Sequence, residues 1–323
     1  MNRQYLRQLL FSDSRQLLIK AEELPSVLME AFPLTDASVP TPGSFLFFPN
    51  PPSYKELTDK ALALLQQELK LSAEYCNVTL TSEFDSPELP DGSIAYHRIW
   101  GFITSDSKWF FSSKQMERDL LAAESNPAIS CHFIHANSPG GEAWYLDRLS
   151  RTMEQLSKPV VTLVELLNCS ACYYITCHSD YIATLTSHDT IGSIGTMVET
   201  YNFDAYYKKL GIKIIREKSE KSDLKNKKHE DLRNGKPEQY IREVLNPLTE
   251  QFISSVRNAR PVLNELPDDD PVFRGETFET EAAIKKGLID GSMTFIEAVG
   301  KAVDLGKSYV EIENLKKSAL NYV

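Results

Sequence analysis

Three short turns of this chain hold the residues whose types and spacing are suited to catalysis. They span residues 136–142, 168–174 and 190–195, and each follows an apolar run that reads as a buried strand. Glycine and other small residues at such points let backbone N–H groups face a ligand. The catalytic groups, if the chain has them, are therefore expected in these turns.

The first turn is suited to binding an oxyanion. Gly140 and Gly141 follow a predicted strand, and a tight turn of this kind can aim backbone amides into a cleft. A plain surface turn carries the same residues. The position between a strand and a helical pattern is what favours the catalytic interpretation.

The second turn is suited to a nucleophile. Ser170 stands where a strand gives way to a helix, although serine at such a place is more often a helix cap. Its small neighbours Ala171 and Cys172 would let a substrate backbone approach, and the N–H of Ala171 could share a developing negative charge. Cys169 and Cys172 are alternative nucleophiles, and their spacing also occurs in redox and zinc sites. No second pair of metal ligands lies nearby, so packing is the simpler role for both thiols.

A serine nucleophile needs a base, and the sequence offers two kinds. His188 is the nearest downstream histidine, with Asp189 beside it. A lysine serves instead if burial lowers its pKa from about 10.4 toward roughly 7–8. The segment 218–228 supplies five candidates: Lys218, Lys221, Lys225, Lys227 and Lys228. At most one of them is expected to be buried.

Composition sets the broad class of the protein. Its 323 residues are 42% hydrophobic and 25% charged, which suits a globular chain of about two domains. A net charge of −10 argues against a general nucleic-acid binder. No signal peptide and no run long enough to be a membrane anchor is visible, and the five cysteines suit a reducing compartment. A cytoplasmic protein is expected.

Strand and helix patterns alternate from residue 93 onward. Strands are predicted at 93–103, 129–136, 160–167, 181–185 and 212–217. Helices are predicted at 113–125, 142–157, 170–179, 203–210 and 237–260. Such alternation is typical of βαβ units that build a largely parallel, buried sheet.

The beginning of the chain differs from this core. Residues 1–32 read as mostly helix, a proline-rich passage follows, and a second helix is expected over 54–75. The apolar run 45–48 within that passage is either a loop on the core or a contact with another subunit. Three domains are expected: an N-terminal extension (1–88), a core (89–300) and a C-terminal helical tail (301–323).

Together these motifs resemble the signal peptide peptidase A family of serine peptidases, in the Clp protease/crotonase superfamily. The likeness runs from about residue 91 to residue 290. It rests on the turns at 137–141 and 170–174, the Gly-Ser-Ile-Gly element at 192–195 and the Gly-Leu-Ile-Asp run at 287–290. It implies an α/β fold with a Clp protease/crotonase-like core of repeated ββα units and a helical N-terminal extension.

The resemblance also assigns roles to residues. It implies that Ser170 is the nucleophile, that Gly141 and Ala171 supply oxyanion amides, and that no histidine is catalytic. The base becomes a downstream lysine, which Ser193 helps to hold. The family usually has two glycines after the serine, and this chain has Ala171 and Cys172 instead.

The choice of lysine is the least direct part of this assignment. The family's usual motif is absent, and an ungapped count falls between Lys221 and Lys225. Lys225 is the expected base, because Ser222 and Asn226 around it resemble a variant of the motif in soluble phage-borne relatives. Lys221 remains the alternative.

The implied function is that of a serine endopeptidase acting on polypeptides through a Ser-Lys dyad, without a metal or organic cofactor. Relatives of this type include head maturation proteases of phages and prophages, so capsid or scaffold proteins are expected partners. A closed homo-oligomer is also expected. The alternatives are an acyl-CoA-handling crotonase and an assembly or scaffold protein that kept the fold without its chemistry.

Overall fold

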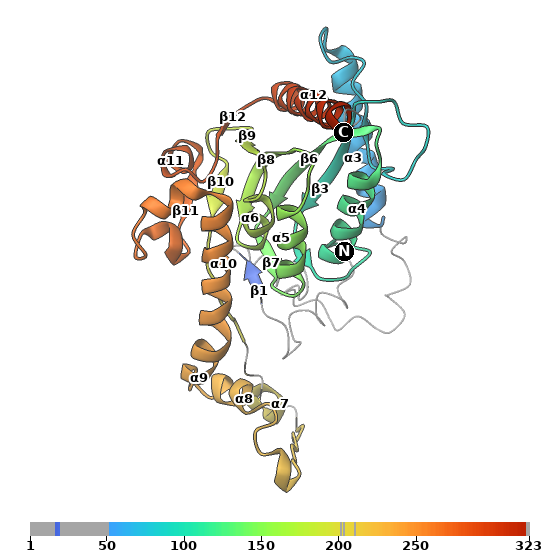
Figure 1. Ribbon diagram of the computed structural model, residues 1–323. Helices are drawn as coiled ribbons and strands as arrows, with labels where there is room; N and C mark the ends of the chain where they lie inside the picture. Colours follow the sequence, from blue (N-terminus) through green and yellow to red (C-terminus); the bar gives the residue numbers. More distant parts are fainter. Residues whose placement is uncertain (1–16, 20–51, 201, 203, 210, 321–323) are drawn as a thin grey trace.

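A computed structural model describes residues 17–19, 52–200, 202, 204–209 and 211–320 (Figure 1). The helix predicted over 1–32 and the apolar run 45–48 lie outside these residues, except for strand β1 (Leu17–Ile19). At those three positions the chain is a strand and not the predicted helix, because its backbone pairs with a strand of the core.

The core is a largely parallel, eight-stranded sheet in the order β11-β10-β8-β6-β3-β2, with β9 beside β8 and β12 beside β9. All of these pairs are parallel except β10 with β11. The strands are β2 (Leu80–Thr81), β3 (Ser93–Trp100), β6 (Ile129–Ser138), β8 (Val160–Cys169), β9 (Tyr181–Thr184), β10 (Thr190–Gly192), β11 (Thr277–Glu279) and β12 (Gly291–Ser292). Strands β6 and β8 are buried along most of their length, as parallel strands with covered faces are.

Helices cover both faces of this sheet. Helix α12 (Phe295–Leu320) packs on one face, where its Phe295 meets Tyr96 and Phe133 in one buried cluster. The other face is covered by α4 (Ser113–Ser125), α5 (Leu146–Glu154), α6 (Ala171–Thr176) and α10 (Asn246–Ala259). Figure 1 shows these two layers on either side of the sheet.

A second, small sheet lies at the carboxyl ends of the main strands. Its order is β1-β7-β4-β5, where β4 is Ile103–Thr104, β5 is Phe111–Ser112 and β7 is Gly140–Glu142. Strand β7 is parallel to β4 and antiparallel to β1. The helix predicted from residue 142 therefore begins later, at Leu146, because residues 140–142 are paired as a strand.

Helix α3 (Tyr54–Leu71) is the described part of the predicted helical extension. It starts with a capping box in which the side chains of Ser53 and Glu56 each bind the other's backbone N–H. The Tyr54 hydroxyl donates to the carbonyl of Arg98 (2.7 Å) and accepts from the N–H of Trp100 (2.9 Å). These two bonds fasten the extension to the edge of the core.

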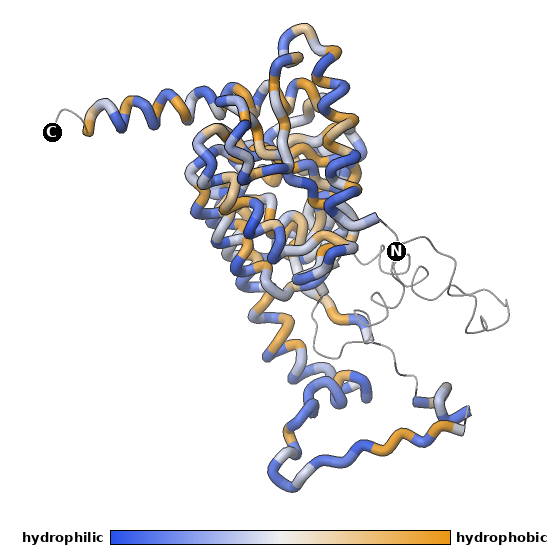
Figure 2. The backbone as a smooth tube through the Cα atoms, turned by 90° about the vertical axis from the view of Figure 1, so that its right-hand side faces the viewer, coloured by the Kyte–Doolittle hydropathy of each residue, from blue (hydrophilic) through white to orange (hydrophobic). Residues whose placement is uncertain are grey.

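The segment between β10 and α10 projects away from the core in both views (Figures 1 and 2). It contains α7 (Asp204–Lys209), a 3₁₀ turn (Glu220–Ser222), α8 (Lys227–Arg233) and α9 (Glu238–Tyr240). The strand predicted at 212–217 is wrong, because no described strand pairs with these exposed residues. The helix predicted at 237–260 is interrupted by a π-helical turn, Ile241–Leu245.

The predicted fold class is confirmed: the chain is an α/β protein with a mostly parallel sheet and a helix before it. Helix α12 runs without a break through the predicted domain boundary at residue 300. Within the described ranges, no helix combines the length and the apolar character needed to cross a membrane.

Candidate active site

Ser170 has a strained backbone at the junction of β8 and α6. Its φ of 56° and ψ of −120° form a conformation that glycine adopts readily and other residues rarely do. The Ser170 N–H donates to the carbonyl of Gly192 (2.8 Å), and its own carbonyl accepts from the N–H of Tyr174 (2.9 Å). A sharp strand-to-helix turn of this kind is how hydrolases present a nucleophilic serine.

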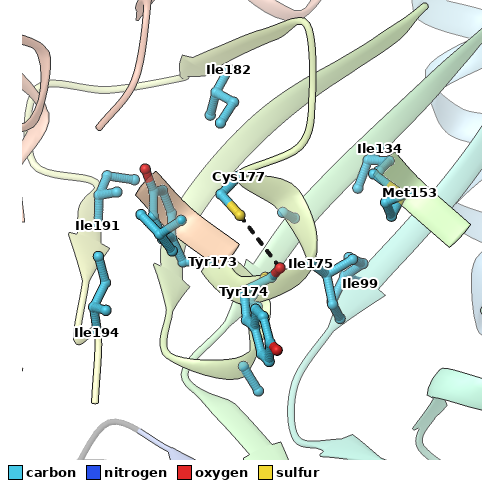
Figure 3. Close-up of a cluster of buried hydrophobic side chains, with 14 of the residues drawn as sticks. Ile99, Ile134, Met153, Tyr173, Tyr174, Ile175, Cys177, Ile182, Ile191 and Ile194 are labelled. Atoms are coloured by element: carbon cyan, nitrogen blue, oxygen red, sulfur yellow. Dashed lines mark hydrogen bonds between the residues drawn. The ribbon is translucent and has the colours of Figure 1, made fainter. Parts of the chain in front are cut away.

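The strain is held in place by dense packing around α6. All six residues of that helix are buried. Figure 3 shows Tyr173 and Tyr174 among isoleucine side chains from both sides, including Ile99 and Ile191. The Tyr173 hydroxyl also donates to the carbonyl of Leu288 (2.7 Å), which ties α6 to the predicted closing motif. A rigid helix can hold its first turn in an unfavourable conformation because leaving it would disturb many contacts.

The hydroxyl of Ser170 is not used to cap α6. It makes no hydrogen bond to any residue that the structure describes. The residue is 1% exposed. The Ser170 hydroxyl thus forms no hydrogen bond with a described residue, and the residue is buried.

The third predicted turn lies directly beside the second. Gly192 pairs with Cys169 in the sheet, and the bond from Ser170 to the Gly192 carbonyl continues this pairing. The next residue, Ser193, also has a positive φ (54°), and its N–H donates to the carbonyl of Glu276 (2.8 Å). The structure therefore brings Ser193 next to the Ser170 turn through the backbone.

The first predicted turn is shaped by Ser138. Its hydroxyl donates to the carbonyl of Gly101 (2.6 Å) and accepts from the N–H of Gly140 (3.1 Å). Gly140 has a φ of 110°, which favours glycine. Gly141 lies so close to β4 that an added Cβ would stand 2.6 Å from the Ile103 nitrogen. Both glycines are therefore required by local geometry.

Strand β7 brings this turn to the candidate nucleophile. It packs against α6, whose first residue is Ala171. As the first helical residue, Ala171 has an N–H with no acceptor inside the helix. The two amides expected to bind an oxyanion, those of Gly141 and Ala171, thus come from two elements in contact.

The cysteines in the nucleophile turn do not have the properties of nucleophiles or metal ligands. Cys169 and Cys172 have no exposed surface and are not joined in a disulfide. Burial, with a smaller contribution from Cys169, raises the pKa of the Cys172 thiol well above its usual value, so it stays protonated. In the described part of the chain, no group of His, Cys, Asp and Glu could hold a metal ion.

The alternative histidine base is not assembled either. The His188 side chain is 83% exposed and lies 3.6 Å from Glu279. Asp189 is fully buried and accepts hydrogen bonds from the backbone N–H groups of Leu166, Leu185 and Thr186. Its carboxylate therefore ties β8 to the turn after β9 and does not orient His188.

The predicted lysines lie away from Ser170 in the single chain. Lys225 and Lys221 are both exposed and belong to the projecting segment, whereas Ser170 is in the core (Figures 1 and 2). The expected burial of Lys225 beside Ser170 is not met within one chain. The geometry of one chain thus holds the candidate nucleophile and its neighbouring amides without the predicted base.

A buried lysine that the sequence did not single out lies elsewhere. Lys158 donates to the carbonyls of Ala123 (2.7 Å) and Asn126 (2.6 Å), and burial lowers its pKa. It precedes β8, whereas Ser170 follows the same ten-residue strand, so the two are on the order of 30 Å apart. Lys158 is therefore not a base for Ser170.

Two bonded groups of buried polar side chains were also not predicted. A hydrogen bond of 3.0 Å joins a ring nitrogen of His97 to one of His132. The other ring nitrogen of His132 is hydrogen-bonded to the carboxylate of Glu124 (3.2 Å). His178 lies 2.7 Å from the hydroxyl of Ser150. Isolated histidines in a sequence carry no signal of such pairing, because the partners come from distant elements.

Comparison with known proteins agrees with this class of site. Residues 152–308 match the model of peptidase family S49, a span that contains Ser170, Ser193 and Lys225. The matched part, just under half of the 323 residues, is similar to peptidase family S49.

Two curated relatives have names that refer to proteolysis. The chain is 28% identical over 192 residues to a Methanocaldococcus jannaschii protein named provisionally as a protease, MJ0651, and the match covers 56% of this chain and 58% of that one. It is 25% identical over 192 residues to protease 4 of Haemophilus influenzae, with 58% of this chain and 30% of the relative covered. The match thus spans less than two thirds of either relative.

Solved structures with a similar arrangement come from two groups of enzymes. A serine-to-alanine variant of the 1510-N membrane-bound stomatin-specific protease gives a TM-score of 0.44 at 18% identity, covering 66% of this chain and 86% of that one. An enoyl-CoA hydratase from Shewanella pealeana gives a TM-score of 0.39 at 13% identity, covering 80% and 84%.

Proposed function

We propose that this chain is a serine endopeptidase whose nucleophile is Ser170. The observation that carries the proposal is the strained backbone of Ser170 (φ 56°, ψ −120°) between a buried strand and a buried helix. Strain of this kind costs about 1–3 kcal/mol and persists where the surrounding structure enforces it, most often at functional sites. The match of this region to a peptidase family supports the same assignment.

The proposed reaction has two steps. The Ser170 hydroxyl attacks the scissile carbonyl and gives up its proton to a base, which returns it to the leaving amine as the C–N bond breaks. Water then hydrolyses the acyl-serine in the same manner. Negative charge on the carbonyl oxygen is stabilised by the amides of Gly141 and Ala171, and each such donor is worth roughly 2.7–4 kcal/mol in other hydrolases.

Lys225 is the proposed base, and its position sets a condition on the mechanism. It is exposed on the projecting segment, so in one chain it cannot take a proton from Ser170. Either a second copy of the chain supplies this segment, or the segment folds back onto its own core. Only a desolvated lysine has a pKa low enough to act as a base. Ser193, beside Ser170, is proposed to accept a hydrogen bond from the lysine once it is in place.

A mixing experiment distinguishes the two routes. Ser170→Ala and Lys225→Ala chains should each be inactive alone. If a second copy supplies the lysine, equimolar mixtures should regain a fraction of the wild-type rate. Some active sites then combine an intact Ser170 from one chain with an intact Lys225 from the other. If the segment folds back, the mixture should stay inactive. The first route also agrees with the proposed homo-oligomer.

The proposed substrate is a polypeptide, and no metal or organic cofactor takes part. A role in phage or prophage head maturation, with capsid or scaffold proteins as partners, is proposed from the family resemblance alone. A cytoplasmic location is proposed because the five cysteines suit a reducing compartment. Hydrolysis of a denatured protein tests the activity. It should be lost in Ser170→Ala and kept in Cys172→Ala, and retention of full activity in Ser170→Ala would exclude the assignment.

A crotonase-type activity is the second candidate. The same pair of amides would polarise a thioester carbonyl, and enoyl-CoA hydratases are among the structural neighbours. Calorimetric titration with an acyl-CoA separates the two, because the peptidase assignment predicts no binding. A chain that neither hydrolyses protein nor binds acyl-CoA would be a scaffold on this fold.

A further inference from the structure

The outer edge of β7, the strand that carries Gly141, is occupied by the chain's own N-terminal residues. β1 pairs with it in antiparallel register, with Leu17 opposite Glu142, Leu18 opposite Gly141 and Ile19 opposite Gly140. In Figure 1, β1 lies beside β7 below α6. The two strands are separated by 120 residues of sequence (20–139), so this pairing is a long-range contact.

The β7 edge is suited to binding an extended backbone of almost any sequence. Its other edge is taken by β4, which leaves one side for a further strand. Two of its three residues are glycines, and the absence of side chains lets a second backbone come close. Strand addition of this kind draws its affinity from main-chain hydrogen bonds.

The same edge lies at the candidate active site. β7 packs against α6, and the Gly141 amide proposed for the oxyanion is part of β7 itself. A polypeptide paired with β7 would therefore run past Ser170. Ser170 is 1% exposed in the structure, so a substrate carbonyl reaches it only after a covering part of the chain has moved.

We propose that the outer edge of β7 is a polypeptide-binding edge and that Leu17–Ile19 is its internal occupant, held where an extended substrate would pair. The bound segment and a substrate then exclude one another, and release of the segment is a step before catalysis. The occupied edge is a property of the fold, whereas the competition with substrate rests on the proposed peptidase function.

The alternative is that β1 is a permanent strand of the small sheet. A permanent strand contributes to global stability, and its loss lowers the melting temperature. An internal occupant can leave while the core stays folded, since β1 belongs to the small sheet and not to the main sheet. The two cases therefore differ in whether disrupting the pairing of β1 with β7 lowers the melting temperature.

Proline substitution in the full chain tests the proposal. In an antiparallel pair, alternate residues direct their N–H toward the partner strand, so one of Leu17→Pro and Leu18→Pro removes a bond to β7. Amide hydrogen exchange at Gly140–Glu142 is measured in a Ser170→Ala background, which removes any effect of self-cleavage. We expect the exchange rate there to rise on the order of fivefold to tenfold in one variant, with an unchanged melting temperature. The control Leu18→Val keeps the N–H and should keep the protection.

A synthetic peptide of residues 12–24 gives the second measurement. Added to the proline variant in which exchange has risen, this peptide should restore slow exchange at Gly140–Glu142. With Ser170 intact, the proline variant should react with a fluorophosphonate faster than wild type, and the peptide should slow it again. Unchanged exchange in both proline variants, a fall in melting temperature with the rise in exchange, or no effect of the peptide on exchange would each overturn the proposal. If exchange responds as expected and no chain ever reacts, the binding edge stands and the proposed peptidase function fails.

Discussion

Replacing Ser170 by glycine should make the protein more stable while removing its candidate nucleophile. A side chain at φ 56°, ψ −120° costs about 1–3 kcal/mol, which glycine does not incur. Glycine loses about 0.5–1 kcal/mol more conformational entropy than alanine on folding. Relative to Ser170→Ala, the glycine variant should therefore gain roughly 0.5–2 kcal/mol in its free energy of unfolding. For a core of this size, each kcal/mol corresponds to a melting temperature about 2–4 °C higher.

The comparison uses two inactive variants, so catalysis does not enter it. Urea unfolding of Ser170→Ala and Ser170→Gly, followed by circular dichroism, gives the difference at equal m-value. Ala171→Gly is the matched control. Its residue is helical, so there glycine should destabilise the chain by about 1 kcal/mol. A glycine variant at position 170 no more stable than the alanine variant would refute the idea that the fold stores strain at this turn.

Three further predictions follow from the contacts around the site and in the core. Gly141→Ala should lower the free energy of unfolding by about 1–3 kcal/mol and remove fluorophosphonate labelling, because its Cβ would overlap the Ile103 backbone; thermal unfolding and labelling measure both. Lys225→Ala should abolish hydrolysis of denatured protein and Lys221→Ala should leave it nearly intact; the reverse result would make Lys221 the base. Burial, with the neighbouring histidine, holds the pKa of His97 well below its usual value, so the unfolded chain binds this proton first. This histidine should leave the free energy of unfolding unchanged above about pH 6.5 and lower it by up to about 1.4 kcal/mol per pH unit below that pH. Denaturant unfolding of His97→Leu at a series of pH values should show a shallower fall.

Much of the core could be predicted from local patterns. The strands expected at 129–136 and 160–167 correspond to β6 and β8, and the helix at 113–125 matches α4. Long apolar runs bounded by small residues signal buried parallel strands, because both faces of such strands are covered. The turns at 136–142, 168–174 and 190–195 can be located for the same reason, since each follows an apolar run.

The remaining features depend on distant parts of the chain. The positive φ of Ser170 is imposed by packing around α6, and a serine in sequence gives no sign of it. The pairing of Leu17–Ile19 with β7 joins segments with no common local pattern, so those residues were expected to be helical. Asp189 was read as a possible partner for His188 because the two are adjacent, whereas its carboxylate is directed to three backbone amides.

The position of Lys225 shows a different limit of sequence reasoning. A motif can indicate which lysine resembles a base, but desolvation comes from what surrounds it. In one chain that residue is exposed. Under the proposed mechanism, burial of Lys225 comes from another copy or another conformation, neither of which a local pattern encodes.

The central claim, that Ser170 is an activated nucleophile, is tested most directly by mass spectrometry after reaction with a fluorophosphonate. The wild type and the two proline variants, Leu17→Pro and Leu18→Pro, are treated over a range of protein concentrations, digested and mapped. The account predicts one adduct, on Ser170, absent from Ser170→Ala and retained in Cys172→Ala. An adduct on any other residue, or no adduct in the wild type and in both proline variants, would contradict it.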